Sequence, residues 1–194
     1  MSQTVTLYRV SQNTFKQLEI SKGMIPFDTS CAKFYLKLDQ AIGLEYILSK
    51  GKSDHETKLI SEIFCPETII GWEEFETLTI EERFDFLHAY ETTSYINIDT
   101  IQEIDSLLKN ISKEEISLNF NSEEEISLNF NSDKLNAKET NAIKWYNDNF
   151  PNLNYNERHI LDEFSKLQMI FREAVIDGDY IVVDYGSWHT ELKY

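Results

Sequence analysis

Four histidines are the side chains in this sequence best suited to acid–base or metal chemistry. His55, His88, His159 and His189 lie one to a segment, and no HxH, HxxxH or HExxH spacing places two imidazoles on one helix face. A metal site would have to be assembled from distant segments, so we expect no metal and no cofactor. The sequence also lacks GxSxG, GxxxxGK[ST] and GxGxxG, so the common hydrolase, P-loop and dinucleotide-binding classes are not indicated.

Runs of carboxylates are a second candidate for chemistry. The runs "GWEEFE", "IEERFD" and "SEEEI" could supply paired acids for hydrolysis, which needs two carboxyl groups facing each other across a substrate. The first turns of helices favour acidic residues because of the helix dipole. We therefore expect these runs to be solvated and to stabilise helix caps, and we assign no catalytic residue.

Aromatic residues in acidic surroundings are the more suggestive feature. They are Trp72, Phe75, Trp145, Tyr146, Phe150, Tyr155 and Trp188. Most aromatic residues in a domain of this size belong to the core. The alternative is a surface where they act as anchors within an acidic rim, as a binder of a basic partner would need. The candidate binding residues are Trp72, His88, Trp145 and Tyr146.

The charge of the chain limits its partners. The 34 Asp and Glu against 18 Lys and Arg give a formal charge of -16, and no cluster of Lys and Arg interrupts this excess. Nucleic acid and anionic membranes need cationic footprints, so we expect neither as a partner. A basic protein would be attracted, although an acidic surface that only keeps the protein soluble explains the charge equally well.

The cysteines and the amino terminus indicate the compartment. Cys31 and Cys65 share no CxxC or CxxxxH context, which favours free thiols in a reducing compartment over a disulfide. The start, "MSQTVTLYRVSQ", has neither a basic n-region nor an apolar h-region, and no apolar run approaches the ~20 residues of a membrane span. We expect a cytoplasmic protein.

The elements that must position these residues begin with two strand-into-helix units. The segments "TVTLYRV" (4–10) and "KFYLKLD" (33–39) alternate as half-buried strands do. Ser11 is the expected cap of a helix over "QNTFKQLEI". Asp39 is the expected cap of a helix over "QAIGLEYILSKG", with Gly51 as its stop.

Two capping boxes predict the next helices. Ser53 with Glu56 precedes an apolar face in "SDHETKLISEIF", and Pro66 limits the length of that helix. Thr79 with Glu82 makes a second box ahead of "IEERFDFLHAY".

A strand over "SYINID" and two amphipathic helices complete the pattern. Asp99 is the expected cap of the first helix, whose apolar face holds Ile101, Ile104, Leu108 and Ile111. The longest helix lies within "NERHILDEFSKLQMIFREAVIDGD", with a stripe of Ile160, Phe164, Leu167, Phe171 and Ala174. The strand "DYIVVDYG" follows Gly178. These elements predict a single α+β domain over residues 1–194, with a small mixed sheet packed against several helices.

A tandem repeat interrupts this pattern at 114–133, where "EEISLNFNSE" is followed by "EEISLNFNSD". The alternation in "ISLNF" would suit a hairpin, but Ser112 with Glu115 is a capping box that the second copy recreates as Ser122 with Glu125. We favour short helical turns over a hairpin. Two copies are too few for a solenoid, so we interpret the repeat as an in-frame duplication absorbed at a surface corner.

The order of elements resembles the YfbM-like family of uncharacterised bacterial proteins. Four segments carry the resemblance: "VTLYRVSQNTFKQLE", "FYLKLDQAIGLEYILSKG", "SYINIDTIQEIDSLLKNISKEEI" and "ILDEFSKLQMIFREAVIDGDYIVVDYG". The resemblance implies a single-domain α+β fold of unassigned function. Ile42 and Tyr46 stand where such proteins usually carry a Trp and a His. The copy at 124–133 looks like an insertion relative to the family.

Two hypotheses of function follow. The first is a non-enzymatic cytoplasmic protein-binding module, of the immunity or antitoxin kind, that holds a basic protein. The second is an enzyme or small-ligand binder with a cleft lined by Trp72, His88 and Trp145, which requires these three residues to converge in space.

Overall fold

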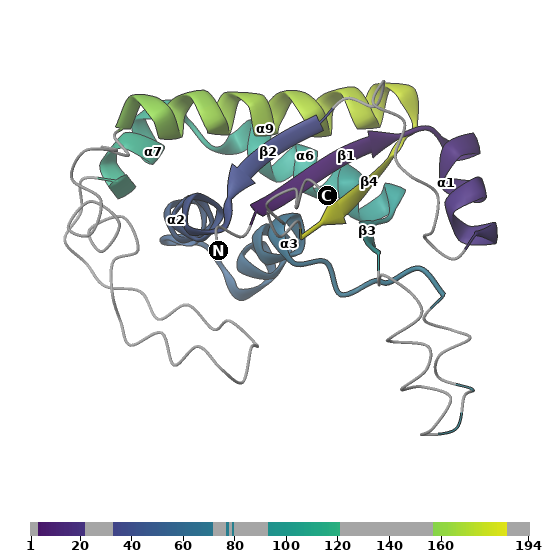
Figure 1. Ribbon diagram of the computed structural model, residues 1–194. Coiled ribbons are helices and arrows are strands. Elements are labelled where there is room, and N and C mark those ends of the chain that lie inside the picture. Colours follow the sequence, from purple (N-terminus) through teal and green to yellow (C-terminus); the bar gives the residue numbers. More distant parts are fainter. Residues whose placement is uncertain are drawn as a thin grey trace, which may run out of the picture.

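The computed structural model describes residues 4–21, 33–71, 93–120 and 157–185, together with Thr77 and Thr79. Within these ranges the chain forms a four-stranded sheet and six helices (Figure 1). The strands are β1 (Thr4–Val10), β2 (Lys33–Lys37), β3 (Ser94–Ile96) and β4 (Tyr180–Asp184). The helices are α1 (Gln12–Ile20), α2 (Leu38–Ser49), α3 (Asp54–Phe64), α6 (Ile98–Asn110), α7 (Lys113–Phe120) and α9 (Glu157–Asp177). The predicted α+β class is confirmed.

The sheet has the strand order β2-β1-β4-β3, and all three pairings are antiparallel. The prediction of a mixed sheet was therefore wrong for the described strands. Tyr8, near the end of β1, pairs with Lys33 at the start of β2. The chain thus re-enters the sheet at the end where it left, so α1 lies within an antiparallel connection instead of forming a parallel crossover.

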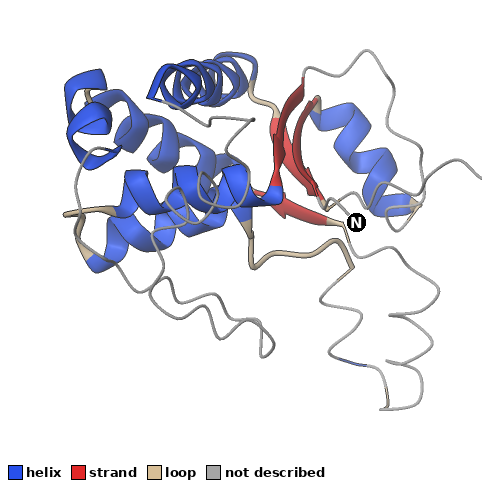
Figure 2. Cartoon of the chain, turned by 60° about the vertical axis from the view of Figure 1, so that its left-hand side comes forward, coloured by secondary structure: helices blue, strands red, loops and turns tan. Residues whose placement is uncertain are grey.

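The two faces of the sheet carry different layers of helices. Figure 2 shows one helix on one side of the strands and the remaining helices on the other side. In β1, Val5 and Leu7 face the main core, whereas Val10 belongs to a smaller cluster with Phe15 and Leu18 of α1. Side chains alternate across a strand, so the period-two pattern of β1 assigns its residues to two cores.

The long helices bury the predicted stripes. All five stripe residues of α9 are at most 1% exposed, and the four apolar residues predicted for the α6 region are at most 4% exposed. The side-chain amide of Gln168 in α9 donates a hydrogen bond of 2.8 Å to the backbone carbonyl of Leu108. The main core therefore lies between the sheet, α9 and α6. In the described residues, no helix is long and apolar enough to cross a membrane.

The starts of the helices follow the capping rules with two corrections. Ser11 and Ser53 cap α1 and α3 as predicted, and Ser53 forms a capping box with Glu56. Helix α2 begins at Leu38, so Asp39 lies inside it, and the Lys37 N–H donates to the side chain of Gln40 at 3.1 Å.

Helix α6 is capped earlier in the chain than predicted. Asn97 accepts a hydrogen bond of 2.9 Å from the Thr100 N–H, which places Asp99 in the first turn. Asp39 and Asp99 were both expected at the cap, where side-chain oxygens bind free N–H groups, but an acidic residue is also stabilised one or two positions later by the helix dipole. The second predicted box, Thr79 with Glu82, stays a prediction, because Glu82 lies outside the described residues.

The described part of the first copy of the repeat, 114–120, is helical. It forms most of α7, where Ser112 accepts a hydrogen bond of 3.1 Å from the Glu115 N–H. Ile116 is fully buried and Phe120 packs against the main core, while Leu118 is 72% exposed. Helical spacing, not alternation, thus decides which residues of this copy are buried. The second copy lies outside the described residues.

Candidate functional site

Glu45 is the most unusual ionisable residue that the structure describes. It lies in α2 within a run, 43–49, in which every residue is buried, and is itself 7% exposed. Burial raises the pKa of its carboxyl from 4.5 to about 7, although a side-chain hydrogen bond with Ser61 opposes this rise. Its Oε2 atom has no hydrogen-bond partner among the described residues. A carboxyl in this position can gain and lose a proton near neutral pH.

Tyr185 lies near this carboxyl, and Cys65 lies beside Tyr185. Tyr185 follows β4, and its hydroxyl donates a hydrogen bond of 2.7 Å to the backbone carbonyl of Phe64, the last residue of α3. Tyr185 is 46% exposed overall, but desolvation of its hydroxyl beside Phe64 raises its pKa well above the usual range, and so do the Cys65 side chain and the nearby charge of Glu45. Cys65 is a free, exposed thiol whose backbone N–H donates 2.8 Å to the carbonyl of Ser61.

Glu62 completes the group, which we call the carboxyl–thiol–phenol cluster: Glu45, Glu62, Cys65 and Tyr185. Burial raises the pKa of Glu62, and the N–H of Glu67 opposes the rise by donating 3.1 Å to its Oε2. Glu67 also pairs with Lys58 at 3.2 Å. The cluster therefore extends from the buried Glu45 to the exposed ion pair between Lys58 and Glu67.

The cluster combines three kinds of reactive group. Glu45 can exchange a proton near pH 7, Cys65 carries a thiol open to solvent, and the phenol of Tyr185 fixes the cluster to the end of α3 by donating to the carbonyl of Phe64. The strand β4 and the helices α2 and α3 hold these groups together. In the described ranges, no group of three His, Cys, Asp or Glu residues could hold a metal ion.

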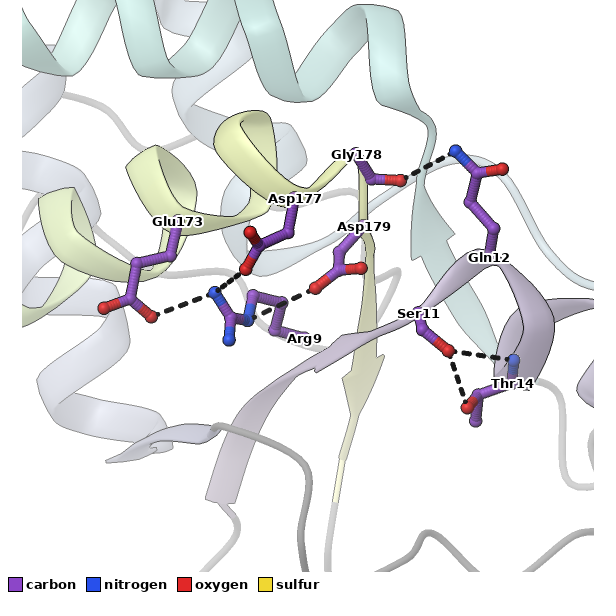
Figure 3. A network of polar contacts seen from close by, with 8 residues as sticks. All are labelled: Arg9, Ser11, Gln12, Thr14, Glu173, Asp177, Gly178 and Asp179. Atoms are coloured by element: carbon purple, nitrogen blue, oxygen red, sulfur yellow. Dashed lines mark hydrogen bonds and ion pairs between the residues drawn. The ribbon is translucent and has the colours of Figure 1, made fainter.

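A second polar cluster surrounds Arg9 and joins β1 to the end of α9. The guanidinium lies 3.0 Å from Glu173, 3.1 Å from Asp177 and 3.4 Å from Asp179 (Figure 3). Burial raises the pKa of Asp179, and the charge of Arg9 opposes this rise. Three carboxylates around one cation form a fixed link between elements, and we assign this cluster to structure.

Beside this link, the turn from α9 into β4 contacts α1. Gly178 has a φ of 68°, and its carbonyl accepts a hydrogen bond of 3.1 Å from Nε2 of Gln12 (Figure 3). The N–H of Asp179 reaches back 2.9 Å to the carbonyl of Ala174, which closes the helix as a glycine cap does.

The residues predicted to form a binding site, Trp72, His88, Trp145 and Tyr146, lie outside the described residues. Their convergence therefore stays a prediction. Of the histidines, His55 is exposed and lies 3.6 Å from Glu103, and His159 is exposed on α9. Tyr46, which stands where the family usually carries a His, is 1% exposed in the main core.

The sequence contains one signal for the cluster that motif spacing does not detect. Glu45 is the single charged residue in "AIGLEYIL", where apolar residues flank it on both sides. A helix that is apolar all round is buried, so a lone acid within it must be buried as well. For Cys65 and Tyr185 there is no such signal, because their proximity depends on the residue after β4 reaching the end of α3, as the hydrogen bond from Tyr185 to Phe64 shows.

Comparisons with known proteins concern the fold alone. No protein-family model matches the chain, and no curated protein matches it. Among solved structures, the chain is similar to the crystal structure of YfbM from Escherichia coli, a protein of unknown function. That match covers 94% of this chain and 99% of the other, with a TM-score of 0.49 and 11% sequence identity. The match assigns no role to any residue.

Proposed function

We propose that this protein is a non-enzymatic binding module that holds a basic protein partner, in the manner of an immunity protein or antitoxin. The observation that carries the proposal is the charge of -16. A surface with so large an excess of one sign attracts oppositely charged proteins and accelerates their encounter.

The pairing of cations within the chain supports this proposal. Arg9 is held by three carboxylates, while Lys52, Lys58 and Lys109 pair with Glu115, Glu67 and Asp105. Four of the positive side chains thus pair with carboxylates of the same chain, in which acidic residues already outnumber basic ones. An external cation would therefore meet a surface with a surplus of carboxylates.

The adjoining surfaces of α3 and α6 are a suitable place to test this attraction. Asp54, at the start of α3, is exposed, and so are Asp99 and Glu103 of α6. The side chains of His55 and Glu103 lie 3.6 Å apart, so these two helices meet at this surface. Neutralising two of these carboxylates lowers the negative charge without touching a buried group.

The test is capture of a partner by the full chain from native lysate at low salt. We expect a stoichiometric basic protein that is released as the salt concentration rises, because screening weakens attraction between exposed charges. The double variant Asp99→Asn/Glu103→Gln should bind it more weakly. The matched variant Lys166→Gln/Arg172→Gln on α9 raises the negative charge and should bind at least as tightly.

Two results would contradict the proposal. One is the absence of any stoichiometric partner at low salt. The other is a partner whose binding is insensitive both to salt and to the α6 substitutions.

A second candidate, an enzyme or small-ligand binder, is favoured by the carboxyl–thiol–phenol cluster. Tyr185 donates its hydroxyl proton to the carbonyl of Phe64 and also contacts the side chain of Cys65, so it lies directly beside the exposed thiol. If the phenol acts on this thiol, the Tyr185→Phe variant in a Cys31→Ser background should react with iodoacetamide at pH 8 at a rate measurably different from that of its parent. Equal rates would mean that the cluster has no role in thiol chemistry.

A further inference from the structure

Four side chains of α7 fix this helix to the surface on which it packs. Ile116 is fully buried in the main core, and Phe120 packs against the same core. Asn119 donates a hydrogen bond of 3.0 Å from Nδ2 to the backbone carbonyl of Ile47 in α2. Glu115 pairs with Lys52 at 2.6 Å. We call this surface the α7 site.

The second copy of the repeat carries the same four side chains at the same spacing. Ten residues later stand Glu125, Ile126, Asn129 and Phe130. The capping serine is repeated as well, since Ser112 is matched by Ser122. Over 112–120 and 122–130 the two copies differ only where Lys113 becomes Glu123, and Lys113 is exposed.

We propose that the α7 site binds either copy of the repeat, so that the segment Glu124–Asp133 of the same chain is its alternative occupant. The four contacts named above can all be remade by the second copy: the apolar insertion, the amide hydrogen bond, the ion pair with Lys52 and the helix cap. The two docked states therefore differ in the lengths of their connections and not in their contacts.

The connections decide which copy occupies the site. Only Ile111 and Ser112 separate α6 from α7. If the second copy docked instead, this link would be about six times longer, and the segment that follows the docked copy would be shorter. The longer link costs loop-closure entropy and the shorter segment recovers part of it. The net effect disfavours this state by about tenfold. The first copy thus holds the site, and the second is a reserve that takes over when the first is damaged.

The experiment places a charge in the buried position of one copy at a time. In the full chain, Ile116→Asp should lower the midpoint of thermal unfolding by only about 3 to 6 °C, the shift that a tenfold change in the folding equilibrium produces in a chain of this size. The matched substitution Ile126→Asp should change the midpoint by less than about 1 °C, because the second copy is then not docked.

The double variant Ile116→Asp/Ile126→Asp removes both occupants. Its midpoint should fall by more than about 10 °C, or its cooperative transition should disappear, because a buried charge is then unavoidable or the site is left open. Equal losses in Ile116→Asp and in the double variant would overturn the proposal. A protective effect of the second copy that vanishes on tenfold dilution would also overturn it, because the occupant would then come from a second molecule.

Chemical cross-linking gives a readout that does not depend on stability. A zero-length carbodiimide should join Lys52 to Glu115 in the wild-type chain, because their side chains already form an ion pair. In Ile116→Asp, fragment mass spectra should place the link at Glu125 instead. A link that stays at Glu115, or that is lost from both positions, would contradict the exchange.

Discussion

Replacing Glu45 with glutamine should stabilise the protein at pH 8 much more than at acidic pH. The folded-state pKa of Glu45 is raised from 4.5 to about 7, mainly by burial. The folded state therefore holds the proton more tightly than the unfolded state does. The stability that the protonated carboxyl contributes is complete below pH 4.5, falls as the pH rises toward 7, and is absent above that value.

The size of the effect follows from the two pKa values. One pH unit between them is worth about 1.4 kcal/mol, so the wild-type protein loses about 3 kcal/mol in all as the pH rises through both values. Glutamine has the shape of the neutral acid and can keep a hydrogen bond to Ser61. The advantage of Glu45→Gln should then grow from about 1 kcal/mol at pH 5.5 to about 3 kcal/mol at pH 8.

Urea unfolding of the two proteins between pH 5.5 and pH 8.5 measures this difference. This range avoids the isoelectric point near 4.6, where association would interfere. The control is Glu19→Gln, because Glu19 is exposed on α1 and its replacement should leave a difference within about 0.5 kcal/mol at every pH. A difference that does not change with pH, or a wild-type protein more stable than Glu45→Gln at pH 8, would refute the reasoning, since either result means that the Glu45 carboxylate has a stabilising partner.

Three further changes test other parts of the fold. Deleting 124–133 should give a folded protein whose melting midpoint shifts by only a few degrees, because α7 keeps all its contacts; a fall beyond about 10 °C would show that the second copy is part of the fold. Gly178→Ala should lower the midpoint of thermal unfolding more than Gly51→Ala does. Both glycines have positive φ, but of the two only Gly178 has a neighbour that an added Cβ would meet, Nε2 of Gln12 at 3.3 Å. Equal changes in the midpoint would show that the Gln12 side chain moves away from the added Cβ without loss of stability. Arg9→Met should lower the free energy of unfolding by about 1 to 2 kcal/mol, since it leaves three partly exposed carboxylates without their cation. Adding Asp179→Asn should recover part of this loss. If urea unfolding shows no recovery, Arg9 acts by packing alone.

The elements of this fold could be predicted because local patterns specify them. The stripe from Ile160 to Ala174 and the alternation of β1 each occur within one element, and the structure buries the residues they select. The caps were less certain, because a Ser, Asn or Asp can either bind the free N–H groups or sit one or two positions later in the first turn. Asp99 and Asn97 illustrate this ambiguity, since both residues suit the start of α6.

The pairing of the strands could not be predicted in the same way. A strand followed by a helix and another strand is compatible with a parallel crossover or with an antiparallel return. The choice depends on which end of the sheet the chain enters after α1, and the pairing of Tyr8 with Lys33 settles it through contacts between distant residues.

The carboxyl–thiol–phenol cluster shows the same limit for chemistry. Glu45, Cys65 and Tyr185 come from α2, the end of α3 and the end of β4, and more than a hundred positions separate the last two, as the hydrogen bond from Tyr185 to Phe64 makes plain. A motif search finds reactive groups that one element brings together, such as two histidines one turn apart. It cannot find groups that meet only because the residue after β4 reaches the end of α3. The burial of Glu45 was still encoded locally, because a single acid within an apolar helix must be paired or protonated. A lone charge in a fully apolar helical segment is therefore worth testing even when no partner for it can be named from the sequence.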